Sequence, residues 1–293
     1  DLSPLSFTLS VLDIPGATVE TFHPKAVHLY GNTLYVANDA PGHYSLEVFD
    51  VSSGNVRHVK SMVEWMNGDK KETFAGEPNG VTRSYGKIYV TNTGSRTDVF
   101  DAETYEFITC IGTGTWGEGG YQTVHAFDVT ASQGAVFIRD KRKLVVVLEQ
   151  DVQPGSAARV PIYSRSVNLQ EAMGTYAVAA RNDGFLYVTA QNKNIIYLFD
   201  PADIRAGDTG FAPYLVTLGF EKSPQSIAFV GDRLFVTLRV DDKRSELWEI
   251  SPKNGKLLQD FTDSMVYPEK IAGARHTLLV VDRATQTVKA IGL

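Results

Sequence analysis

Residues Gly86–Gly112 read "GKIYVTNTGSRTDVFDAETYEFITCIG", and this stretch decides the fold. It contains three short runs of β-branched and aromatic residues, which favour strands. Clusters of Gly, Asn, Asp, Ser and Thr, the usual turn residues, separate these runs. The stretch therefore predicts consecutive antiparallel strands that are joined by tight turns. It carries no obvious catalytic residue and no metal-ligand spacing.

The same plan recurs along the whole chain. Each copy has a short apolar strand, a turn with Gly, Asn or Asp, a β-branched and aromatic strand, and a third strand that often ends in Phe-Asp. The copies align on a position that is usually proline, with spacings of 54, 46, 51, 49 and 44 residues: Pro24, Pro78, Val124, Thr175, Pro224 and Pro268. Short antiparallel strands at this period are typical of propeller blades. We expect an all-β, six-bladed β-propeller of four-stranded antiparallel blades, forming one domain over residues 1–293.

The two ends of the chain complement each other. After Pro268 there is room for only three strands, whereas the alternating stretch Leu5–Leu12 belongs to no complete copy. An unpaired blade edge exposes backbone donors and acceptors to wrong partners. We therefore expect this N-terminal strand to become the outer strand of the last blade.

Composition excludes several classes of protein. The chain has 28 Lys and Arg against 34 Asp and Glu, a net charge of −6, which argues against a nucleic-acid surface. No apolar run is long enough to predict a transmembrane segment. Cys110 is the single cysteine, so an internal disulfide and a CxxC site are excluded. The start at Asp1 rather than Met suggests either a removed signal peptide, for a secreted, periplasmic or cell-surface protein, or trimming of the chain.

Two known repeats resemble these copies. "IYVTN" at Ile88–Asn92 resembles the core of the YVTN-type propeller repeat. The copies that begin at Pro78, Pro224 and Pro268 are similar to the NHL repeat, as is the later "VVD" at Val280–Asp282. The resemblance covers almost the whole chain and implies the propeller fold. It does not imply an activity.

The best candidate site follows from the alignment. Inner strands of a propeller converge on an axial tunnel, and each copy has a hydrogen-bonding residue one place after the aligned position. These six residues are Lys25, Asn79, His125, Tyr176, Gln225 and Glu269. We hypothesise that they form a polar ring at the tunnel mouth. His28 lies further along its strand, and the connection Ile111–Thr123 brings Trp116 and Tyr121 to the same face, where an aromatic ring could stack on a ligand.

Three functions stay open at this point. The first is a binding or scaffold module for a small polar molecule, a glycan fragment or a peptide at this ring. The second follows from a similarity to six-bladed calcium-dependent lactonases and phosphotriesterases. It implies a metal-dependent hydrolase, with calcium held by oxygen ligands from Asn79, Asp128, Gln225 and Glu269. Lys25 and Lys270 would place positive charge close to that metal. The third is a protein–protein interaction platform without a small-molecule site. No Gly-x-Ser-x-Gly elbow accompanies the six histidines, so a nucleophilic triad is not expected.

Overall fold

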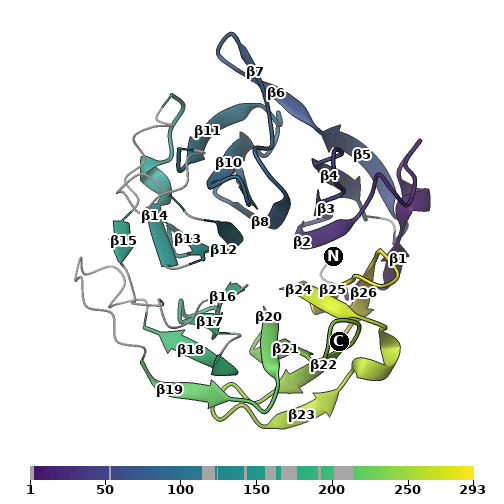
Figure 1. Ribbon diagram of the computed structural model, residues 1–293, viewed down its shortest axis with the longest axis vertical. Coiled ribbons are helices and arrows are strands. Elements are labelled where there is room, and N and C mark those ends of the chain that lie inside the picture. Colours follow the sequence, from purple (N-terminus) through teal and green to yellow (C-terminus); the bar gives the residue numbers. More distant parts are fainter. Residues whose placement is uncertain are drawn as a thin grey trace.

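Six four-stranded antiparallel sheets are arranged in a ring around a central axis (Figure 1). The computed structural model describes residues 3–52, 54–113, 123, 125–141, 144–155, 163–165, 177–190, 193–200 and 214–293. The expectation of an all-β, six-bladed propeller is therefore confirmed. No helix within these residues has the length and apolar character needed to cross a membrane.

In blades one to three, each chain segment runs from an inner strand at the axis to an outer strand at the rim. Their strands are β2 (Pro24–Tyr30), β3 (Thr33–Asn38), β4 (Ser45–Asp50) and β5 (Arg57–Met62); β8 (Pro78–Ser84), β9 (Lys87–Asn92), β10 (Arg96–Asp101) and β11 (Phe107–Ile111); and β12 (Ala126–Ser132), β13 (Ala135–Asp140), β14 (Leu144–Leu148) and β15 (Tyr163–Arg165). A separate hairpin, β6 (Glu64–Asn67) with β7 (Lys70–Thr73), projects from the ring between blades one and two (Figure 1).

Blades four to six follow the same plan, and the last blade takes its fourth strand from the N-terminus. Their strands are β16 (Val178–Ala180), β17 (Leu186–Ala190), β18 (Ile195–Phe199) and β19 (Tyr214–Gly219); β20 (Ser223–Val230), β21 (Arg233–Arg239), β22 (Ser245–Ile250) and β23 (Leu257–Asp260); and β24 (Pro268–Ala274), β25 (Thr277–Asp282), β26 (Thr287–Gly292) and β1 (Phe7–Leu9). Single 3-10 turns occur at η1 (Val11–Asp13), η2 (Glu149–Asp151) and η5 (Thr262–Ser264).

Strand β1 closes the ring as expected. It pairs antiparallel with β26, so that Phe7 lies opposite Ala290 and Leu9 opposite Val288. Leu9 is fully buried, in a core cluster that contains residues of both blade six and blade one. The Leu5 N–H also donates to Thr277 Oγ1 at 2.8 Å. The N-terminal strand is thus held by backbone pairing and by apolar packing together.

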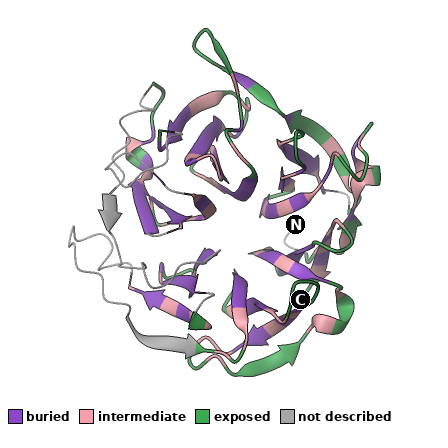
Figure 2. Ribbon diagram, in the orientation of Figure 1, coloured by how far each residue is buried: buried purple, intermediate pink, exposed green. Residues whose placement is uncertain are grey.

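The apolar core lies between neighbouring blades. Buried residues concentrate on the inner and middle strands, whereas the outer strands β5 and β23 are largely exposed (Figure 2). The inner strands also approach one another closely. A Cβ atom on Gly80 would lie 2.8 Å from the Asp128 Cα in the next blade, so only glycine fits there. This close packing places side chains of different blades within reach of each other at the axis.

Candidate functional site

A β-bulge opens the inner strand of five blades. In β2, Pro24 pairs with Asn38 and Ala26 with Ala37, which leaves Lys25 as the extra residue. A bulge interrupts the alternation of side chains and re-aims the extra one. The extra residues of the five strands are Lys25, Asn79, Phe127, Gln225 and Glu269. Four of them are residues of the ring that the sequence predicted.

The fifth bulge corrects the sequence alignment in blade three. Ala126, rather than Val124, pairs with Asp140 as Pro24 pairs with Asn38. The alignment predicted from the sequence therefore begins blade three two residues too early. Phe127 occupies the ring position predicted for His125. His125 instead precedes the strand, where its N–H donates to Asp140 Oδ1 at 3.2 Å. The equivalent N–H of His23 donates to Asn38 Oδ1 at 2.8 Å, so this position has a structural role.

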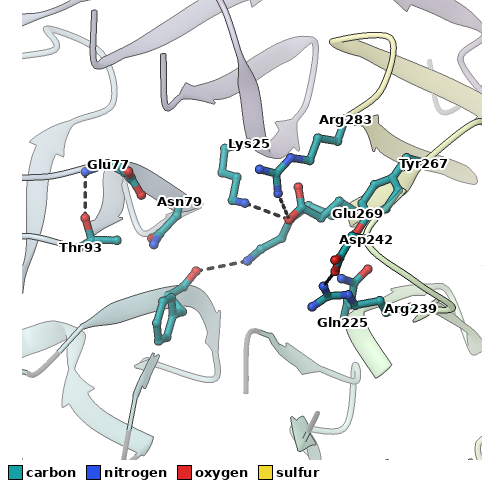
Figure 3. Close-up of a pocket in the computed structure, with 12 residues that line it drawn as sticks. Lys25, Glu77, Asn79, Thr93, Gln225, Arg239, Asp242, Tyr267, Glu269 and Arg283 are labelled. Atoms are coloured by element: carbon teal, nitrogen blue, oxygen red, sulfur yellow. Dashed lines mark hydrogen bonds and ion pairs between the residues drawn. The ribbon is translucent and has the colours of Figure 1, made fainter. Parts of the chain in front are cut away.

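The re-aimed side chains line one cavity at the tunnel mouth, the mouth cavity, with a volume of about 470 Å³ (Figure 3). The structure brings Lys25, Asn79, Gln225 and Glu269 together there. The full lining is Lys25, Glu77, Asn79, Thr93, Phe127, Gln225, Arg239, Asp242, Tyr267, Glu269, Lys270 and Arg283. Tyr176, Trp116 and Tyr121 lie outside the residues that the structure describes.

Opposite charges neutralise each other within the mouth cavity. Glu269 Oε1 lies 3.0 Å from Lys25 Nζ and 3.2 Å from Arg283 Nη1 (Figure 3). Burial alone would raise the pKa of Glu269, but the charges of Lys25, Arg283 and Lys270 outweigh it and lower that pKa below its ordinary value. Arg239 forms an ion pair with Asp242 in the same cavity. The lining is therefore dipolar, with no large excess of either sign.

Two amides are among the neutral hydrogen-bonding groups of the cavity, together with the hydroxyl groups of Thr93 and Tyr267. Asn79 is buried, and its Oδ1 accepts a hydrogen bond from Thr91 Oγ1 at 3.0 Å. Gln225 is 7% exposed, and its Oε1 is buried without a hydrogen-bond partner in the protein. A buried acceptor without a donor is costly, so Gln225 favours a ligand or water that donates.

An ion pair crosses the axis at the floor of this cavity. With the corrected register, Lys270 and Asp128 occupy the same position in opposite blades, directly after the bulge. Four other blades have small residues at this position: Ala26, Gly80, Ala177 and Ser226. Lys270 Nζ lies 3.0 Å from Asp128 Oδ1, and it donates to the Phe127 carbonyl at 3.2 Å. The side chains of Lys270 and Asp128 are only 8% and 15% exposed.

This ion pair divides the axial channel. Lys270 lines the mouth cavity, whereas Asp128 lines a second cavity of about 170 Å³. The second cavity, here the axial cavity, is bounded by residues of all six inner strands, most of them apolar. His28 lies in the axial cavity rather than at the mouth. Burial raises the pKa of Asp128 and lowers that of Lys270, while their mutual attraction opposes both shifts.

The arrangement does not fit the calcium set inferred from the lactonase similarity. Asn79, Gln225 and Glu269 line the mouth cavity, but Asp128 lines the axial cavity and is paired with Lys270. Glu269 is already paired with Lys25 and Arg283, and the Lys270 ammonium on the axis would repel a divalent cation. Within the part of the chain that the structure describes, no group of three His, Cys, Asp or Glu residues could hold a metal ion.

A serine, a histidine and a glutamate meet on blade one without forming a catalytic triad. Glu47 Oε2 lies 2.7 Å from His58 Nε2 and accepts from Ser61 Oγ at 2.6 Å. Ser61 Oγ also lies 3.2 Å from the same Nε2. In a triad the carboxylate binds Nδ1, which leaves Nε2 free to take the serine proton. Here both partners lie at the same nitrogen, so the cluster lacks the arrangement of a catalytic triad.

His28 should make stability depend on pH. Its Nε2 is buried without a hydrogen-bond partner, and burial, together with the charge of Arg83, lowers its pKa from 6.5 to about 4. The unfolded chain thus takes up a proton at a higher pH than the folded one, and acid favours unfolding. We expect His28 to contribute a loss of up to about 3 kcal/mol in the free energy of unfolding between about pH 7 and pH 4. Urea titrations of the wild type and of His28→Gln at both pH values test this, because the variant should lose less. Equal losses in the two proteins would contradict it.

Comparisons with known proteins support the fold. No protein-family model and no curated protein sequence matches the chain significantly. Virginiamycin B lyase from Staphylococcus aureus is similar in structure, with a TM-score of 0.62 and 12% identity over 98% of this chain and 99% of that one. The β-propeller domain of Cps50 (Swd1) from Myceliophteria thermophila has a TM-score of 0.59 and 14% identity over 95% and 98%. A chain of a mitotic checkpoint complex has a TM-score of 0.62 and 12% identity over 100% and 92%. At such identities the likeness concerns the fold alone.

Proposed function

We propose that this protein is a binding module whose mouth cavity holds a small polar molecule, a glycan fragment or a peptide. The observation that carries this proposal is the repeated bulge, which turns one side chain from each of five blades toward a single cavity. We also propose that the repeats are related to the NHL and YVTN types, on the residues that resemble them.

The chemistry of the lining restricts the class of ligand that the mouth cavity can hold. Glu269 is paired with Lys25 and Arg283, and Asp242 is paired with Arg239, so a ligand with a large net charge would break existing ion pairs. Asn79 and Gln225 remain as neutral groups, and Gln225 Oε1 requires a donor. A neutral or dipolar ligand with hydrogen-bond donors satisfies both conditions.

A thermal-shift screen of the whole chain tests this proposal. The probes are neutral sugars, free amino acids and dipeptides, because a ligand that binds only the folded state raises the melting temperature. We expect at least one class to raise it, and Gln225→Leu to abolish the shift. Gln259→Leu is the matched control, since Gln259 is an exposed amide on the outer strand of the same blade.

Other outcomes of the same screen favour the alternatives. A shift with calcium chloride, lost in Glu269→Gln, would support the metal-dependent hydrolase instead. If no probe and no calcium changes the melting temperature, the proposal fails. A protein–protein platform would then be favoured.

A further inference from the structure

A further cavity, the side groove, adjoins the mouth cavity and has a volume of about 420 Å³. The two cavities share four lining residues: Lys25, Glu77, Glu269 and Arg283 (Figure 3). The other residues of the side groove come from blades one and six, and they are His23, Pro24, Asp39, Pro41 and Gln286. Because four lining residues belong to both cavities, one extended ligand can contact both.

Two carboxylates of the side groove have no partner of opposite charge. Asp39, which follows β3, is half-buried, and Glu77, which precedes β8, is exposed. Among the described residues, neither side chain forms an ion pair or a hydrogen bond. Burial raises the pKa of Asp39, and the nearby cations Lys25 and Arg283 offset this only in part. These two carboxylates therefore lack a compensating positive charge.

The charges that line the two cavities do not balance. Four of them are cations: Lys25, Lys270, Arg239 and Arg283. Three carboxylates are paired with these cations, and they are Asp128, Asp242 and Glu269, the last of which is shared by Lys25 and Arg283. Asp39 and Glu77 bring the carboxylates to five, so five negative charges against four positive ones leave one negative charge. A ligand with a single ammonium group would compensate it without breaking an existing ion pair.

The fold does not require these carboxylates at their positions. The Asp39 N–H donates to the His23 carbonyl at 3.0 Å, across the first two strands of blade one. In blade two the Thr93 N–H makes the equivalent bond to the Glu77 carbonyl, at 3.1 Å. Both bonds join backbone atoms only, so the same geometry holds an aspartate or a threonine at one end and a histidine or a glutamate at the other. The Asp39 and Glu77 carboxylates are thus available to a ligand.

Two amides that are more than nine-tenths buried line the adjoining mouth cavity. Asn79 is 4% exposed, and its Oδ1 accepts from Thr91 Oγ1 at 3.0 Å, which leaves its NH2 group to donate into the cavity. Gln225 is 7% exposed, and its Oε1 has no hydrogen-bond partner among the described residues. A half-turn of the Gln225 amide brings either its oxygen or its NH2 group to the cavity. A peptide group, with one C=O and one N–H, matches such a pair of amides.

We propose that the two cavities together bind a peptide with a free N-terminus, with its ammonium group between Asp39 and Glu77 and its first peptide groups beside the two amides. The inference rests on the proposed function, and it names the ligand class of the same site. A neutral sugar would use the amides but leave the two carboxylates uncompensated. A divalent cation is disfavoured by Lys25 and Arg283, and no three His, Cys, Asp or Glu side chains of the described residues form a metal site.

Calorimetric titration of the whole chain tests the inference. The probes are trialanine, triserine and trileucine, each in its free, N-acetylated and C-terminally amidated form. We expect at least one free tripeptide to bind, its amidated form to bind within about threefold of it, and its N-acetylated form to bind at least about tenfold more weakly. Asp39→Asn should weaken the free form about tenfold, and Glu77→Gln, at an exposed carboxylate, about two- to fivefold. Glu103→Gln, at an exposed glutamate in the turn between β10 and β11, is the matched control and should leave the affinity unchanged.

The possible outcomes separate this inference from the proposed function. Equal binding of the free and N-acetylated tripeptides, or loss of binding on C-terminal amidation alone, would overturn the inference and leave a binding module in place. Binding of neutral sugars without any tripeptide would have the same meaning. If neither the tripeptides nor the probes of the thermal-shift screen bind, the inference and the proposed function both fail.

The variants also have a readout that is independent of binding. Asp39→Asn and Glu77→Gln should keep the urea midpoint of the wild type, because neither carboxylate is paired with a described residue. A lower midpoint for Asp39→Asn would show that its carboxylate stabilises the fold and would overturn its assignment to the ligand. Unchanged tripeptide affinity in both variants would overturn the position of the ammonium group.

Discussion

Replacing Lys270 by methionine is expected to lower the free energy of unfolding by about 3–5 kcal/mol. Asp128 would keep the Val178 N–H at 3.0 Å but would lose the ammonium group at 3.0 Å. Its carboxylate would then remain near the axis without its counter-charge, which is the costly way to break a buried ion pair. Equilibrium urea unfolding at about pH 7, followed by intrinsic fluorescence, measures the change.

A double variant separates the effect of losing the ion pair from the effect of leaving one buried charge unpaired. In Asp128→Leu/Lys270→Met both charges are absent, and we expect stability within about 1 kcal/mol of the wild type or above it. The control is Arg57→Met, which removes an ion pair with Asp50 at 2.8 Å whose arginine is 71% exposed. This exposed pair should contribute at most about 1 kcal/mol. A Lys270→Met effect no larger than the Arg57→Met effect would show that the axial pair is not buried in solution.

Deleting Leu5–Leu12 is expected to destabilise the whole ring by at least about 3 kcal/mol. The deletion removes strand β1, the fully buried Leu9 and the partner of β26. Leu9→Ala alone should cost about 2–5 kcal/mol, because it leaves a cavity between blade six and blade one. Urea unfolding gives both values. The exposed edge of β26 should also promote self-association, which light scattering detects.

Thr8→Ala is the matched control on the same strand. Thr8 lies opposite Lys289, and its side chain is exposed. Its replacement should change the free energy of unfolding by less than about 0.5 kcal/mol. If the deletion variant unfolds as cooperatively as the wild type, and at the same urea concentration, β1 does not close the ring.

Most of the fold could be predicted because local sequence patterns determine its turns and strands. Turn residues such as Gly31 and Gly86 have positive φ angles, and β-branched strands such as Ile88–Val90 are fully buried. These signals repeat six times, so a wrong alignment of one blade does not change the predicted six-bladed architecture. The closing strand followed from a count of strands and from the cost of an open edge.

The candidate site was only partly predictable, because it depends on register. Blade three lacks proline at the aligned position, so the sequence pattern predicts His125, a polar residue near the strand start, as the ring residue. The bulge places Phe127 there instead. The same two-residue error hid the ion pair, since Asp128 and Lys270 share a column only in the correct register.

The pairing of the first strand with the last has a consequence for synthesis. On a ribosome the chain emerges from its N-terminus, so β1 is made first and its partner β26 is made last. Phe7 and Leu9 therefore have no native strand partner while the intervening blades form one after another. Closure brings together residues at opposite ends of the chain, the kind of long-range contact that is slow to form. The nascent propeller thus stays an open arc until translation of its last blade is complete.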